Sequence, residues 1–197
     1  MNWLAHLFLS EPDVEMRLGN LLADIVKGTE RQKLNSQIQR GMKCHQIIDQ
    51  FTDNHIIFQR SKQRLNPDYR RFSGVIVDVF YDHYLAKNWG NYTNIGLNDF
   101  TNEIYTSFQN YPGQIPYIVR QLITRVAAED WLGSYQQISG VENTLIRISR
   151  RLTRRTNKHF MLHLSVSELI KYYNEFEQDF IDFFPDLVLH LKNYSDI

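Results

Sequence analysis

Histidine and aspartate residues recur at helical spacing in two stretches of the sequence. His45, Asp49 and Asp53 are four residues apart, so a helix would place their side chains on one face, with Cβ atoms about 5–6 Å apart. Asp78 and Asp82 repeat this spacing in a more apolar stretch. Carboxylates and neutral imidazoles are the usual ligands of Mn²⁺, Mg²⁺, Fe²⁺ and Zn²⁺. Two such helices packed together would build a metal site, and we expect a metal-dependent phosphoester hydrolase.

Asp78 is the most informative single residue, because it lies between two valines in an apolar run. An unpaired carboxylate buried there would cost several kcal/mol, so it needs either a metal ion or a basic partner such as Arg70 or Arg71. Asp82 is followed directly by His83, and neighbours on a helix point about 100° apart. Either of these two could bind a metal, with the other binding phosphate or orienting a ligand.

Three further residues have a structural and a functional interpretation. His6 lies in an apolar segment, where it is either a hydrogen-bonded core histidine or part of the site. Asp24 lies in an otherwise apolar helical pattern, as a solvent-facing acid or as a ligand. Cys44 is the one cysteine, which excludes an internal disulfide and favours a buried apolar role over a nucleophilic one.

Apolar residues recur at helical spacing along most of the chain, and no strand pair is evident. We expect an all-α fold, with residues 1–197 forming a single-domain bundle of about eight helices. The β-branched run at 75–79 could form a strand, but unalternating apolar residues continue to position 85 and favour a helix. A long helix is predicted from Ser165 or Ser167 to Pro185, followed by a short one over 186–194.

The composition limits the possible partners. Basic and acidic residues number 22 each, so no overall field attracts polyanions, and an acidic partner needs a local patch. The apolar start of the chain lacks the basic region of a signal peptide, and no run approaches the roughly 18 apolar residues of a membrane span. With a single cysteine, these features predict a soluble cytoplasmic protein without a membrane partner.

Basic residues cluster near position 150 at spacings of three and four, which predicts one helical stripe. The stripe is either a solvated face or a dock for an acidic surface. Aromatic residues are not interleaved with it, which favours a protein partner over nucleic acid. The members are Arg147, Arg151, Arg154 and Lys158, with Arg150 and Arg155 at the margins.

Common catalytic motifs of other classes are absent from the sequence. It contains no GxxxxGK[ST] loop, GxGxxG after a strand, CxxC pair, GxSxG elbow or HExxH pattern. Walker-type nucleotide hydrolysis and serine hydrolase chemistry are therefore disfavoured.

Four motifs within about the first 90 residues resemble the acyl carrier protein phosphodiesterases, a noncanonical branch of the HD-type metal phosphohydrolases. The resemblance implies an HD-like helical fold. It also makes Asp24, His45, Asp82 and His83 metal-site candidates, although the usual His-Asp pair is reversed here. The motifs are Asn2 to Leu7, Gly19 to Asp24, His45 to Asp53 and Asp78 to His83.

Members of that family remove 4′-phosphopantetheine from holo acyl carrier protein in a Mn²⁺-stimulated reaction that leaves a free serine, so the resemblance links this chain to fatty acid biosynthesis. Serine alkoxide is a poor leaving group, and His83 or His6 could protonate it with Asp49 or Asp53 orienting. We place the metal on Asp24, His45, Asp78 and Asp82, and the acidic carrier protein on the basic stripe. The alternatives are a phosphohydrolase of nucleotides or other small phosphodiesters, and a non-enzymatic helical binding module.

Overall fold

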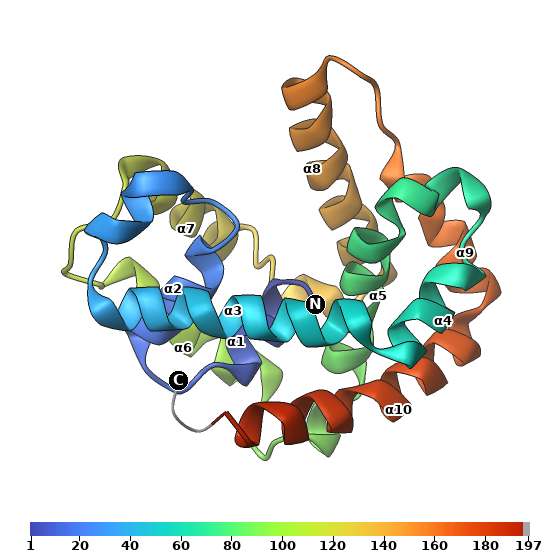
Figure 1. The fold of residues 1–197 in the computed structure, drawn as a ribbon, viewed down its shortest axis with the longest axis horizontal. Helices are drawn as coiled ribbons and strands as arrows, with labels where there is room; N and C mark the ends of the chain where they lie inside the picture. The colour runs from blue at the N-terminus through green and yellow to red at the C-terminus, as the bar shows by residue number, and fades with distance from the viewer. Residues whose placement is uncertain (195–197) are drawn as a thin grey trace.

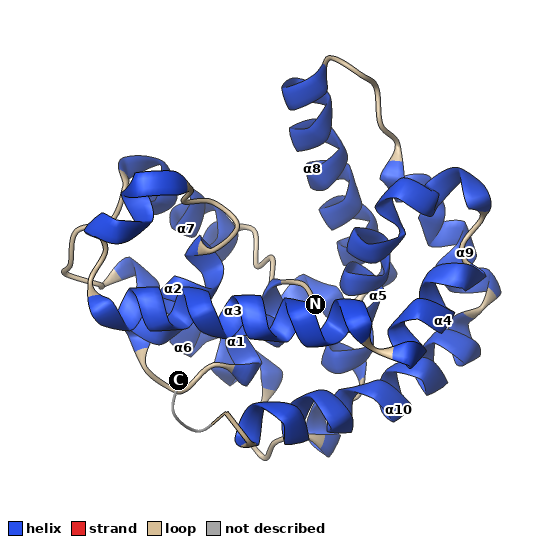
Figure 2. Cartoon of the chain, viewed as in Figure 1, coloured by secondary structure: helices blue, strands red, loops and turns tan. Residues whose placement is uncertain are grey.

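The computed structural model describes residues 1–194, which form helices joined by turns and contain no strand (Figure 2). The all-α prediction is confirmed, with ten α-helices in this range instead of about eight. They are α1 (Trp3–Leu9), α2 (Val14–Leu22), α3 (Ser36–Asn54), α4 (Ile56–Arg64), α5 (Ser73–Lys87), α6 (Leu97–Gln109), α7 (Tyr117–Ala128), α8 (Ile138–Thr156), α9 (Val166–Lys171) and α10 (Tyr173–Lys192). Short 3-10 turns lie at η1 (Gly28–Lys33), η2 (Pro67–Phe72), η3 (Trp89–Asn91), η4 (Gly133–Gln136) and η5 (Leu162–Ser165).

Helix α5 is the central element of the fold. Eleven of its 15 residues are buried, and it packs against α1, α4, α8 and α10. A helix that is covered on all sides is apolar all round, which explains the run of β-branched residues that resembles a strand in the sequence. The predicted helix is confirmed here. None of the helices within residues 1–194 combines the length and the apolar character that crossing a bilayer requires.

Helices α2 and α3 cross in close backbone contact at two glycines. A Cβ on Gly19 would overlap the carbonyl oxygen of Ile38, and one on Gly41 would overlap that of Met16. No side chain fits between the two helices at this point. The crossing therefore fixes the end of α2 beside the middle of α3, where the candidate metal ligands lie.

The first turn of α1 is held by an acid from α5. Asp82, which is fully buried, accepts hydrogen bonds from the backbone N–H of Leu4 at 2.7 Å and of Ala5 at 3.3 Å. Asn2, at the N-cap position, makes no capping hydrogen bond with its side chain. Asp82 therefore satisfies amides that the helix itself leaves without acceptors, and it ties α1 to α5.

The C-terminal helices correct two predicted boundaries. Chain direction changes at Tyr172, so α9 and α10 are separate, and α10 continues through Pro185 instead of ending there. Phe184 and Leu187 on either side of the proline are fully buried, and this packing keeps the helix continuous. Buried Asp179 also anchors α10, since its carboxylate accepts hydrogen bonds from Arg60, Ser61 and Arg64 of α4.

Adding a methyl group at the crossing of α2 and α3 should destabilise the protein. We expect Gly19→Ala to lower the free energy of unfolding by roughly 2–3 kcal/mol, because the new Cβ overlaps backbone of α3. Gly90→Ala is the matched control, since a Cβ there meets no atom within 4 Å, and should change stability by less than about 0.5 kcal/mol. Urea denaturation measures both. Equal losses in the two variants would show that close backbone contact does not hold this crossing.

Candidate metal centre

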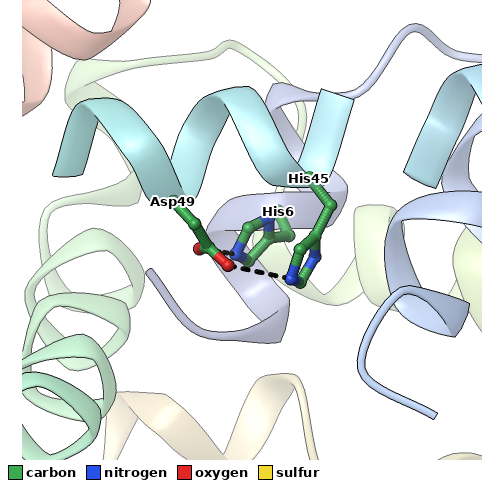
Figure 3. A group of neighbouring side chains, drawn as sticks. All are labelled: His6, His45 and Asp49. Atoms are coloured by element: carbon green, nitrogen blue, oxygen red, sulfur yellow. Dashed lines mark hydrogen bonds and ion pairs between the residues drawn. The ribbon is translucent and has the colours of Figure 1, made fainter. Parts of the chain in front are cut away.

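Two histidines and an aspartate converge between α1 and α3 (Figure 3). His6 Nε2 lies 3.1 Å from Asp49 Oδ1, and His45 Nε2 lies 3.0 Å from Asp49 Oδ2. The two imidazole rings stack with centroids 4.0 Å apart. One ligand atom from each of the three residues lies within 4.8 Å of the others. The predicted pairing of His45 with Asp49 on one helix face is therefore present, and His6 joins it from a distant part of the sequence.

A chain of hydrogen bonds fixes the orientation of the His6 ring. The Ser10 hydroxyl donates to the His6 carbonyl oxygen at 2.9 Å, so Ser10 Oγ must accept the 2.6 Å hydrogen bond from Asn20 Nδ2. The amide oxygen of Asn20 then faces His6 Nδ1 at 2.9 Å and accepts its proton. A neutral His6 is thereby held as the Nδ1–H tautomer, with the lone pair of Nε2 directed at Asp49.

Burial and the proximity of His45 lower the pKa of His6 to about 4, which leaves the ring neutral near pH 7. Its Nε2 faces two oxygen acceptors, the Met1 carbonyl at 3.0 Å and Asp49 Oδ1 at 3.1 Å. Although burial opposes it, the hydrogen bond from His45 and the neighbouring His6 hold the pKa of Asp49 well below its usual range. The lone pair of His6 Nε2 and the two oxygens it faces thus converge with no proton between them, an arrangement that suits a bound cation.

His45 and Asp24 form the open side of this cluster. His45 Nε2 lies 3.7 Å from Asp24 Oδ1, and His45 Nδ1 is buried without a hydrogen-bond partner within residues 1–194. Helix α2 ends at Leu22, so Asp24 lies in the turn that follows and not inside a helix. Its other oxygen accepts from Trp3 Nε1 at 3.4 Å. Asp24 is thus near the cluster and half-exposed, in a position to add a further ligand.

The cluster opens onto a pocket of about 400 Å³. The acidic and imidazole side of this pocket is formed by Asp24, His45, Asp49, Asp53 and Asp78. Side chains of this pocket come from the start of the chain, the turn after α2, α3, α5, α7, the segment between α7 and α8, and α8 itself. A volume of this size is typical of sites for small molecules.

Asp78 lines the pocket but is paired differently from the prediction. Its Oδ1 lies 2.7 Å from the α-ammonium of Met1, so the basic partner is neither Arg70 nor Arg71. Burial raises the pKa of Asp78 to about 6, although the ammonium acts in the opposite direction. Asp78 is not one of the three residues that converge, and its role as a metal ligand stays a prediction.

The structure does not bring Asp82 or His83 to this pocket. Both oxygens of Asp82 accept backbone hydrogen bonds of α1, and burial raises its pKa to about 7. His83 Nδ1 lies 2.7 Å from the Tyr135 carbonyl oxygen and its Nε2 lies 2.8 Å from the Tyr173 hydroxyl. Adjacent positions on the fully covered helix α5 point at different neighbours, so each of these residues has local partners.

Helix α8 supplies the opposite, basic side of the pocket and projects from the rest of the fold (Figure 1). Arg147, Arg151 and Arg155 line the pocket. Of the other members of the predicted stripe, Arg154 lines a separate groove and Lys158 follows the end of the helix at Thr156. Whether these residues bind a partner stays a prediction.

Sequence patterns do not predict several residues of the site. Asn20 sets the tautomer of His6, and Trp131 and Thr144 contact Arg147 inside the pocket. Asn20 lies in a motif of the resemblance, two positions before the end of α2, which is the one available signal. Trp131 and Thr144 have no such signal, because only the tertiary fold brings them to the pocket.

Comparison with known proteins places the whole site within one family. The family model described as "Acyl carrier protein phosphodiesterase" matches residues 1–187, well beyond the motifs near the start of the chain. No solved structure matches this chain. The relation to HD-type enzymes therefore stays a prediction.

Curated relatives agree with the family model over nearly their full length. A protein of Pectobacterium atrosepticum named acyl carrier protein phosphodiesterase is 29% identical over 189 residues, which is 95% of this chain and 96% of the relative. Proteins of the same name from Yersinia pestis and Serratia proteamaculans are 29% and 27% identical, the latter over 98% of both chains. This chain belongs to the acyl carrier protein phosphodiesterase family.

Proposed function

We propose that this chain is a metal-dependent phosphodiesterase that hydrolyses the bond between 4′-phosphopantetheine and a serine of holo acyl carrier protein, giving apo carrier protein. The convergence of His6, His45 and Asp49, the last two of which line the pocket, is the observation that carries this proposal. The names of the relatives supply the substrate. No observation in the described residues favours nucleotides or another small phosphodiester.

The donor set of this cluster fits a divalent cation. Two imidazoles and a carboxylate suit Mn²⁺, which we propose as the metal, held by His6, His45 and Asp49 with Asp24 beside them. The Nδ1–H of His6 donates a hydrogen bond to the amide oxygen of Asn20. Such a contact from the second ring nitrogen usually orients a metal-binding histidine. When bound, such a cation activates water near neutral pH and offsets negative charge on the phosphoryl oxygens.

The chain's own groups then hold the reacting atoms. Asn20 keeps the proton of His6 on Nδ1, so its Nε2 stays available as a donor of electrons. The leaving serine oxygen needs a proton, and Asp78, a partly buried carboxyl group of the pocket whose pKa burial raises to about 6, can supply one. His83 has no such role in this proposal, because both of its ring nitrogens have partners outside the pocket.

The acidic carrier protein would approach the basic side of the pocket. Arg151 and Arg155 are exposed on α8 at the pocket, where an acidic surface gains favourable charge contacts. Arg154 and Lys158 do not line the pocket, so this proposal assigns the partner to Arg151 and Arg155 alone.

A mass measurement tests the reaction directly. Holo acyl carrier protein incubated with this protein and Mn²⁺ should lose the mass of the phosphopantetheine group, because the proposed cleavage frees the serine. An excess of EDTA should abolish the loss by removing the activating cation. A nucleotide panel run in parallel serves as the control. Cleavage of nucleotides with intact holo carrier protein would contradict the proposed substrate.

Single substitutions test the ligand set. We expect His45→Gln and Asp49→Asn each to weaken Mn²⁺ binding by more than roughly 100-fold, since even an outer partner of a metal ligand is typically worth 10–100-fold. Titration monitored by electron paramagnetic resonance measures free Mn²⁺, and circular dichroism checks the fold. His83→Gln, which lies outside the pocket, is the control and should keep the parent affinity. Loss of Mn²⁺ binding in His83→Gln but not in His45→Gln would place the metal elsewhere.

A further inference from the structure

The arginines of the pocket lack the acidic partners that several other arginines of this protein have. Arg17 pairs with Glu103 at 2.6 Å and Arg64 pairs with Asp179 at 2.8 Å. Within residues 1–194, no carboxylate lies within 4.0 Å of a guanidinium nitrogen of Arg147, or of the two arginines that follow it on α8 at the pocket.

Arg147 is the most restrained of the three. Its Nη2 donates to Thr144 Oγ1 at 2.7 Å, and its guanidinium lies 4.0 Å from the centre of the Trp131 ring. Trp131 in turn stacks on Trp3, with ring centroids 5.8 Å apart and planes at 18°. This stack fixes the plane of the guanidinium while leaving edge N–H groups to bind a ligand.

Arg147 is half-buried, and Glu129, the carboxylate that acts on it, lies beyond 4.0 Å and forms no direct ion pair. Burial lowers the pKa of Arg147, so the folded protein partly opposes its charge. The C-terminal dipole of α8 favours basic residues in the last turn, such as Arg155, but Arg147 lies in the middle of a 19-residue helix. Arg155 is therefore explained as a solvated basic residue at the end of the helix, whereas this explanation does not apply to Arg147. An anion in the pocket would supply the missing partner.

Shape and position identify the kind of anion. The pocket of about 400 Å³ admits a small group but no folded protein surface, and its opposite side carries His45 and Asp49 of the metal cluster. A planar guanidinium matches a phosphate through two parallel N–H donors. We propose that Arg147 binds the phosphate of the substrate phosphodiester, held in place by Thr144 and Trp131. This inference rests on the proposed function and adds a residue that contacts the substrate.

Phosphate binding can be measured without turnover. Two of the three tryptophans, Trp3 and Trp131, line the pocket, so tryptophan fluorescence of the full chain in EDTA should respond to sodium phosphate. We expect Arg147→Gln to weaken phosphate binding by roughly 10- to 100-fold, the range for a hydrogen bond between charged groups. Arg147→Lys should restore only part of the affinity, because a lysine lacks the planar pair of donors.

Arg150→Gln is the matched control, since it removes the same charge from α8 but faces the separate groove, and should keep the parent affinity. Equal affinities for the Arg147 and Arg150 variants, or no response of the parent protein to phosphate, would overturn the proposal. Sodium acetate at the same ionic strength should give no response that depends on Arg147. If it does, the site binds anions in general and the phosphate assignment fails.

Failure of the Arg147 proposal can be distinguished from failure of the proposed reaction. With holo carrier protein and Mn²⁺, Arg147→Gln should lower kcat/KM by roughly 10- to 100-fold while Mn²⁺ affinity stays at the parent value. Phosphate binding through Arg147 without release of phosphopantetheine would reject the proposed reaction and keep this inference. Release of phosphopantetheine at equal rates by Arg147→Gln and Arg150→Gln would support the proposed reaction and reject the role of Arg147.

Discussion

The site depends on how the first helix is held against the core. A helix of seven residues is too short to be stable alone, and its first amides would be buried without acceptors if the core supplied none. Asp82 of α5 accepts from the amides of Leu4 and Ala5, and the helix then carries His6 to α3. The acid that the sequence predicts as a metal ligand thus positions a histidine of the candidate centre.

Two further constraints complete the arrangement. Asn20 follows Gly19 of the α2–α3 crossing and faces His6 of α1, so the tautomer of the histidine is set by packing that lies outside the pocket. The pocket itself has sides of opposite charge, with Asp49 on α3 and Arg147 on α8. A phosphodiester presents anionic oxygens that a cation and a guanidinium could hold from two directions, which unites the two proposals.

Local geometry was predictable from the sequence and long-range pairing was not. Helical periodicity predicts the helices, and spacing of four places His45 and Asp49 on one face. Spacing cannot tell which neighbour a residue on a fully buried helix meets, so Asp82 and His83 were predicted in the site although both have partners elsewhere. The sequence does not decide whether His6 belongs to the core or to the site, because its partners Asn20 and Asp49 are 14 and 43 positions away.

The central claim is that His6, His45 and Asp49 surround one cation. Anomalous diffraction from crystals grown with Mn²⁺ and recorded at the manganese absorption edge tests it most directly. The account predicts one strong peak about 2.0–2.4 Å from Nε2 of each histidine and from a carboxylate oxygen of Asp49. A peak beside Asp82 instead, or no peak in crystals whose protein binds Mn²⁺ in solution, would contradict it.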